Sequence, residues 1–187
     1  MRLLARIFLY FLLLMPSHFS VVSSDDIFKK AETLQVMLKK SSGIFVSAER
    51  QVGLERTVLV TGCNYGFINH LQNFKCFADR LGLKFLVIAL DERSYLYLAK
   101  HSDMNVYYMS SGSDKSSDAI TSDSTTFRSK QFNLITARKK EAVHDILSLG
   151  YDVIFSDTDV AILKDPTPYL LWKNVDYVHS LNAPCEK

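Results

Sequence analysis

The stretch Gly150-Tyr-Asp-Val-Ile-Phe-Ser-Asp-Thr-Asp-Val160 carries the strongest structural signal in the sequence. Its residues 152–156 predict a short buried β-strand, because Val, Ile and Phe favour strands and Gly150 ends the helical pattern that comes before. Two carboxylates, Asp157 and Asp159, follow the strand at once and are themselves followed by apolar residues. The stretch therefore predicts a strand that brings two acidic side chains to the edge of a sheet.

Similar apolar runs alternate with helical patterns along most of the chain. The predicted strands are residues 57–61, 84–90, 105–109, 152–156 and 176–181, and the predicted helices are residues 25–40, 67–81, 94–101 and 131–149. Strands that are almost continuously apolar and alternate with helices are typical of a parallel sheet covered on both faces. We therefore expect an α/β fold, with a Rossmann-type and mostly parallel sheet and helices on both faces.

The composition fits one globular domain. The 187 residues are 48% hydrophobic and 22% charged, which is too apolar for a disordered chain. Lys and Arg number 22 against 20 Asp and Glu, so the formal net charge is +2. Because binding to nucleic acid usually requires a clustered basic excess, this balance argues against nucleic acid as the main partner.

The N-terminal residues indicate entry to the secretory pathway. Residues 1–24 place basic side chains before the apolar run 7–15 and match either a cleaved signal peptide or an uncleaved signal-anchor in a membrane. Residues 25–56 then predict a stem helix and a linker, ahead of a domain at 57–187. The sequence therefore predicts a protein of the secretory lumen or of its membrane.

Residues 110–126 differ from the rest of the chain in composition. They include seven Ser, three Thr and three Asp. Such a segment has little apolar surface to bury, so it predicts a flexible loop inside the domain. We expect this loop to be dispensable for the fold.

The spacing of Asp157 and Asp159 favours a divalent metal. In an extended chain, residues two positions apart point to the same side, so the two carboxylates would lie close together. Their repulsion calls for a compensating cation, and oxygen ligands suit Mg²⁺ or Mn²⁺ that also bridges to phosphate. The alternative is a pair of solvated turn carboxylates.

Two reactions use such a carboxylate pair. In haloacid-dehalogenase-like phosphatases the motif follows the first strand, with Thr or Val two residues after the second Asp. Here the motif comes late, Ala161 occupies that position, and few residues remain for the further ligands of that fold. Transfer of a sugar from a nucleotide-diphosphate donor uses the metal to neutralise the departing diphosphate. The order of the predicted elements fits this second reaction.

Two blocks of sequence resemble the nucleotide-diphospho-sugar transferase domain of family 77 glycosyltransferases, which include plant cell-wall xylosyl- and arabinosyltransferases. The first block is VLVTGCNYGFINHLQNFKC with the later LVIALDE, and the second is GYDVIFSDTDV-x-x-L-x-DP. The resemblance covers about residues 56–181 and implies a GT-A fold that is incomplete at the C-terminus. It also implies a nucleotide-sugar donor, such as a UDP-sugar, a Mn²⁺ or Mg²⁺ cofactor, a glycan or glycoprotein acceptor, mostly retaining transfer and residence in the Golgi.

The resemblance also implies roles for individual residues. Asp159 would be a direct metal ligand, and Asp157 would contact the donor directly or through the metal. Lys139 would approach the diphosphate, with Arg138 as a less certain neighbour. The residues implied to line the nucleoside pocket are Thr61, Asn64 and Asp91. Asn64 as a turn residue and Lys139 as a solvated helix residue stay open as alternatives.

No residue is predicted to act as a catalytic base. Related domains continue through an acceptor-binding half, which is not seen in this sequence. The alternative to an active transferase is therefore a truncated, non-catalytic fragment that binds a nucleotide-sugar or has a structural role in the secretory pathway.

Overall fold

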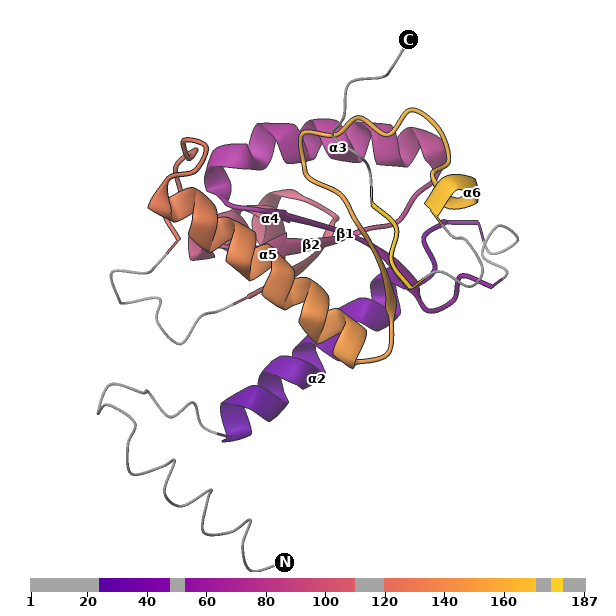
Figure 1. The fold of residues 1–187 in the computed structure, drawn as a ribbon, viewed down its shortest axis with the longest axis horizontal. Helices are drawn as coiled ribbons and strands as arrows, with labels where there is room; N and C mark the ends of the chain where they lie inside the picture. Colours follow the sequence, from indigo (N-terminus) through magenta and orange to yellow (C-terminus); the bar gives the residue numbers. More distant parts are fainter. Residues whose placement is uncertain (1–23, 48–52, 110–119, 171–175, 180–187) are drawn as a thin grey trace, which may run out of the picture. The chain divides into compact units, whose positions relative to one another are not determined.

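The computed structural model describes residues 24–47, 53–109, 120–170 and 176–179, and it divides the chain into two units, residues 1–32 and 33–187. The first unit contributes the start of one helix, and side chains are described from residue 33 onward. Figure 1 shows the ribbon of the described elements. In chain order these are α2 (Ser24–Ser41), β1 (Thr57–Cys63), the 3-10 helix η2 (Tyr65–Phe67), α3 (Ile68–Leu81), β2 (Leu86–Ala89), α4 (Glu92–His101), β3 (Asn105–Tyr108), α5 (Lys130–Ser148), β4 (Asp152–Phe155) and α6 (Thr167–Leu170).

The four strands form one parallel sheet in the order β3-β2-β1-β4. The chain moves outward from β1 to β2 and β3, and then returns to place β4 on the other side of β1. The direction of the strand order therefore reverses between β1 and β4. In open α/β sheets ligands bind at such a switch point, outside the carboxyl ends of the strands.

Helices cover both faces of the sheet, as the sequence predicts. On one face, α3 and α4 bury Leu71, Phe74 and Leu98 against strand residues such as Leu59 and Val87. On the other face, α5 and the second half of α2 pack against β1 and β2. Figure 1 shows α3 and α5 on opposite sides of the strands. The buried side chains of this second layer include Leu34, Leu38, Val58, Val60, Leu86, Ile88, Ile135, Ala142 and Ile146.

The domain core begins earlier in the chain than the predicted boundary at residue 57. Leu38, Ile44 and Phe45, which the sequence analysis placed in a stem and linker, are at most 2% exposed. Phe45 also forms an isolated antiparallel bridge with Leu83. Residues 33–47 are therefore part of the folded domain, because their apolar side chains complete both core layers.

Two strand predictions differ from the structure. Gly62 was expected to end the first strand, but β1 continues through Cys63. The strand expected at residues 176–181 is absent over the described residues 176–179, where Tyr177 is 76% exposed. The other strands and the main helices lie within two residues of their predicted bounds.

The predicted signal peptide or signal-anchor, residues 1–24, lies outside the described residues except for Ser24. Among the helices of the described part, none has both the length and the apolar character needed to cross a bilayer. Residues 110–119 of the Ser-rich segment also lie outside the description.

Candidate functional site

The Asp157-Thr158-Asp159 motif lies in a turn directly after β4. The backbone N–H of Ser156 still bonds to the carbonyl of Val60 at 3.0 Å, so the strand ladder reaches the motif. The N–H of Val160 then bonds back to the carbonyl of Asp157 at 3.3 Å and closes the turn. The sequence argument for paired carboxylates assumed an extended chain, and the turn replaces that geometry. Thr158 is buried, whereas Asp157 and Asp159 are exposed at the edge of the sheet.

A lysine from α5 reaches this edge by passing over β1. The Nζ atom of Lys139 lies 2.6 Å from Oδ1 of Asp157. Gly62 makes the approach possible, since a Cβ atom built on it would lie 3.3 Å from Cγ of Lys139. The structure therefore brings together Lys139 and Asp157, two predicted donor-binding residues 18 positions apart, at the switch point of the sheet.

The side chains at this point have the chemistry that a hard divalent cation requires. Mg²⁺ and Mn²⁺ prefer oxygen ligands and often take only one or two carboxylates from the protein, with phosphate oxygens and water completing the shell. Within the described residues, no group of three or more His, Cys, Asp or Glu side chains gathers to hold a metal. The carboxylates of Asp157 and Asp159 fit a metal that a diphosphate helps to bind, and not a preformed protein cage.

Asn64 and Asp91 are held by the chain itself. The side-chain amide of Asn64 donates to the carbonyls of Thr121 and Asp123, both at 2.8 Å. The carboxylate of Asp91 accepts from the N–H of Tyr65 at 3.0 Å and from the hydroxyl of Ser122. It also accepts from the backbone N–H of residue 94 at 3.4 Å, as the N-cap of α4.

The end of the Ser-rich segment is thus attached to the ends of β1 and β2. Gly66 shows how close the attachment is, because a Cβ on it would lie less than 3.0 Å from backbone atoms of Asp123 and Ser124. Composition alone predicted a flexible loop over the whole of 110–126. Residues 121–124 are instead bonded to two side chains that the sequence analysis assigned to the nucleoside pocket.

Thr61 and Arg138 lie apart from the lysine–aspartate pair. Along β1, residues alternate between the two faces, so Thr61 shares the α3 face with Leu59 and Cys63, while Gly62 lies on the α5 face. Thr61 is fully buried and its hydroxyl has no hydrogen-bond partner among the described residues. Arg138 forms its ion pair with Glu141 at 2.7 Å, on the surface of α5.

Cys63 is a buried thiol at the end of β1, close to these charges. Burial, with a smaller contribution from the Asp91 carboxylate, raises its pKa to about 12, and Lys139 opposes the shift. Neither Cys63 nor the exposed Cys76 forms a disulfide in the part of the chain that the structure describes. A thiol kept neutral in this way is a packing side chain and not a nucleophile.

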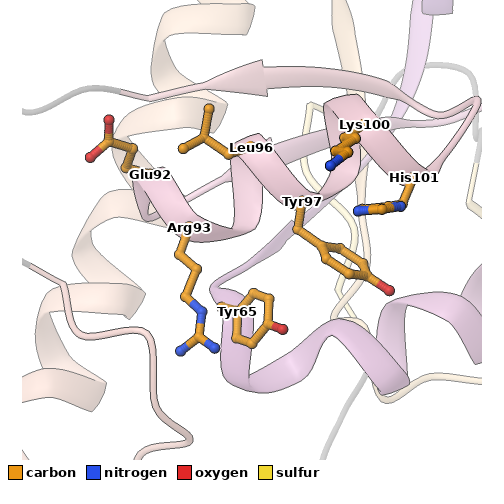
Figure 2. A pocket seen from close by; sticks show the side chains of 7 residues that line it. All are labelled: Tyr65, Glu92, Arg93, Leu96, Tyr97, Lys100 and His101. Atoms are coloured by element: carbon orange, nitrogen blue, oxygen red, sulfur yellow. The ribbon is translucent and has the colours of Figure 1, made fainter.

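A separate pocket of about 420 Å³ lies between η2 and α4, and Figure 2 shows the side chains that line it. The guanidinium of Arg93 lies 3.8 Å from the centre of the Tyr65 ring, and Tyr65 meets Tyr97 edge-on at 5.6 Å. No sequence motif pointed to this pocket. The complete lining is Tyr65, Glu92, Arg93, Leu96, Tyr97, Lys100 and His101.

Comparison with known proteins identifies relatives of this arrangement. Residues 82–183, which include Asp91, Lys139 and both aspartates of the motif, match the family model described as nucleotide-diphospho-sugar transferase. No solved structure matches the chain significantly.

Three curated relatives are sugar transferases by name. The beta-arabinofuranosyltransferase RAY1 of Arabidopsis thaliana is 32% identical over 116 residues, 62% of this chain and 21% of the relative. The UDP-D-xylose:L-fucose alpha-1,3-D-xylosyltransferase 3 of the same plant is 27% identical over 163 residues, 81% of this chain and 41% of the relative. The UDP-galactose:fucoside alpha-3-galactosyltransferase of Dictyostelium discoideum is 27% identical over 133 residues, 60% of this chain and 20% of the relative. The chain therefore spans less than half the length of these relatives.

The family match covers more than half of the chain, and it includes strands β2, β3 and β4 and the charged residues Lys139, Asp157 and Asp159. The α/β architecture is that of a GT-A-like Rossmann fold. The chain belongs to the nucleotide-diphospho-sugar transferase family.

Proposed function

We propose that this protein is a glycosyltransferase that binds a UDP-sugar at the β1–β4 switch point and transfers the sugar to a glycan or glycoprotein acceptor. The observation that carries the proposal is the contact of Lys139 with Asp157 at 2.6 Å, beside a glycine that leaves room for the lysine. The names of the relatives support the class of donor, since two of them are UDP-sugar transferases. The motif and the lysine are both within the family match.

Lys139 and the two aspartates have complementary tasks in this proposal. The side chain of Lys139 is 22% exposed, and its ammonium would bind the diphosphate of the donor while remaining close to Asp157. Asp157 and Asp159 would hold Mn²⁺ or Mg²⁺, which supplies positive charge to the leaving diphosphate. The lysine adds a second positive charge at the same place, and fixed charges of this kind favour the departure of an anionic leaving group. Stabilisation of the leaving diphosphate in this way is compatible with transfer that retains the configuration of the sugar, and we include retention in the proposal.

The place of action in the proposal is the secretory pathway, with the Golgi as the compartment and the N-terminal residues 1–24 as signal peptide or membrane anchor. The basis is the basic-then-apolar pattern of these residues and the class of the relatives. Expression of the full chain with a C-terminal fluorescent tag would test it, because a cytosolic signal would contradict the proposal.

The decisive experiment is calorimetric titration of the full chain with UDP, with and without Mn²⁺. We expect saturable binding that requires Mn²⁺ and that Asp159→Asn abolishes. Lys139→Gln should weaken UDP binding roughly ten- to a hundredfold, because a charge-assisted contact is worth about 1.5–3 kcal/mol. Lys140→Gln is the matched control, since it removes the same charge from the next, exposed residue of α5.

The outcomes separate two functions. Binding of UDP together with release of free sugar or transfer to an acceptor supports the glycosyltransferase. Binding without turnover of any UDP-sugar would leave a non-catalytic nucleotide-sugar-binding protein. Equal UDP binding by the native protein, Asp159→Asn and Lys139→Gln would contradict the proposed site.

A further inference from the structure

The pocket between η2 and α4 lies beside a different pair of strands from the proposed donor site. Tyr65 follows β1 and the other lining residues belong to α4, which follows β2. Asp157 follows β4, on the opposite side of β1. Neighbouring strands are about 4.8 Å apart, so the carboxyl ends of β2 and β4 are separated by about 10 Å. The pocket adjoins Asn64 and Asp91, which the family resemblance assigns to the nucleoside pocket, so its ligand would lie beside the nucleoside end of a bound donor.

The pocket is built from two rings and one fixed cation. Arg93, Tyr97 and His101 recur every four residues and form one stripe of α4 that faces Tyr65 (Figure 2). The guanidinium of Arg93 stacks on Tyr65 at 3.8 Å, which restricts its orientation. Figure 2 shows the carboxylate of Glu92 directed away from this stacked pair.

The positive charge of the pocket has no carboxylate partner. Within the described residues, neither Arg93 nor Lys100 forms an ion pair, whereas Arg138 and Lys75 elsewhere on the surface each do. Arg93 and Lys100 are seven residues apart on one helix, so their backbones are separated by about 10 Å along its axis. The pocket thus offers two cations that form no ion pair with a described residue, with aromatic rings between them.

We propose that this pocket binds an acidic saccharide, with a uronate carboxylate on Arg93 and a sugar ring against Tyr97. The fork of an arginine matches a carboxylate with two parallel hydrogen bonds, and a stacked arginine is already oriented for them. Aromatic side chains supply the flat apolar surface on which the C–H face of a sugar ring can lie. Because the proposal names a class of acceptor, it rests on the glycosyltransferase function proposed above.

The geometry favours a saccharide over the nucleotide in this pocket. The Arg93 guanidinium already lies over the Tyr65 ring, so this ring face is not open to a nucleotide base. The lining is also shallow for a base, since Leu96 is 57% exposed. An anionic ring ligand that lies along α4 uses both cations and leaves the arginine–tyrosine stack intact.

Titration of the full chain with a trisaccharide of β-1,4-linked glucuronate, in the presence of saturating UDP and Mn²⁺, tests the proposal. The same trisaccharide as its uncharged methyl ester and a tri-glutamate peptide serve as matched ligands. We expect the acidic trisaccharide to bind and both matched ligands to bind at least tenfold more weakly. Arg93→Gln should weaken trisaccharide binding about tenfold or more without changing UDP binding. Arg80→Gln is the matched control variant, because Arg80 also lies over a ring, that of Phe77, on the surface of α3.

The other outcomes can be told apart. Equal binding of the tri-glutamate peptide would mean a surface that attracts any anion. Competition between UDP and the trisaccharide would assign the pocket to the donor. Absence of trisaccharide binding in a protein that still binds UDP and Mn²⁺ would refute this inference and leave the donor site standing. Trisaccharide binding without UDP binding would refute the donor site instead.

Discussion

Replacement of Gly66 by alanine should detach residues 121–124 from the carboxyl edge of the sheet. The new Cβ would lie less than 3.0 Å from backbone atoms of Asp123 and Ser124. A backbone segment cannot relieve such a clash by changing rotamer, as a flexible side chain can. Gly66 has no positive φ, so alanine fits the local conformation and the collision is the main effect. Relief of the collision requires this segment to move away from β1.

The cost follows from the hydrogen bonds that the movement breaks. Asn64 would lose its bonds to Thr121 and Asp123, and Asp91 would lose the hydroxyl of Ser122. After exchange with water, two neutral hydrogen bonds contribute about 1 kcal/mol each and one to a carboxylate about 2 kcal/mol, so complete loss of all three sets an upper bound of about 4 kcal/mol that partial detachment does not reach. We therefore expect a loss of about 2–3 kcal/mol in the free energy of unfolding.

Urea denaturation followed by circular dichroism measures this loss, and limited trypsin digestion after Arg128 reports the release of the segment. Gly62→Ala is the matched control, because the nearest atom to its Cβ belongs to the flexible Lys139 side chain, at 3.3 Å, and the substitution should cost less than 1 kcal/mol. If Gly66→Ala and Gly62→Ala lose the same stability and are digested at the same rate, the attachment of the segment contributes nothing and the reasoning is wrong.

Four further predictions test other parts of the fold. At pH 8 a thiol reagent should modify Cys76 much faster than Cys63, and peptide mass spectrometry would show equal rates if burial did not protect the thiol. The same burial raises the pKa of Cys63 from 9.0 to about 12. The stability that the buried neutral thiol contributes is therefore complete below pH 9 and is lost as the pH rises towards 12. Arg56→Ala should lower the free energy of unfolding by about 1–2 kcal/mol, because its side chain bonds to the carbonyl of Gly150 at 2.7 Å beyond the end of α5; full rescue by lysine would contradict this. Asp91→Ala should cost about 3–4 kcal/mol, because it removes the α4 N-cap and the acceptor of the Tyr65 N–H and the Ser122 hydroxyl, and a change below about 1 kcal/mol in urea denaturation would exclude these roles.

Sequence reasoning was sufficient for the elements that have a regular apolar period. The strand at residues 152–156 was predictable from its β-branched and aromatic residues, although only Ile154 of β4 is buried. The helix that ends before Gly82 was predictable because a glycine suits the left-handed C-cap. The meeting of Lys139 with Asp157 was expected only through family resemblance. The spacing of the two residues in the sequence cannot predict their contact, since the contact depends on which face of β1 the helix α5 crosses.

The remaining differences arise from long-range contacts that composition does not encode. The Ser-rich segment looks unable to pack, yet two side chains outside it, Asn64 and Asp91, bind its backbone and a hydroxyl. Gly62 looked like a strand terminator because glycine is usual there, and its real neighbour is a lysine stem from a distant helix. Tyr65 and Arg93 form a pocket wall through a stacking contact that only the folded chain reveals.

Gly62 is uncharged, and it nevertheless affects the electrostatic potential at the edge of the sheet. The position of the Lys139 ammonium depends on free volume above β1, so any side chain added at residue 62 would push a positive charge away from Asp157 without altering a single ionisable group. A series of Ala, Ser and Val at this position would therefore vary the local potential in steps while the net charge of the protein stays at +2. In a family whose donors carry a diphosphate, the size of a neutral side chain can in this way set how firmly the phosphate end is held.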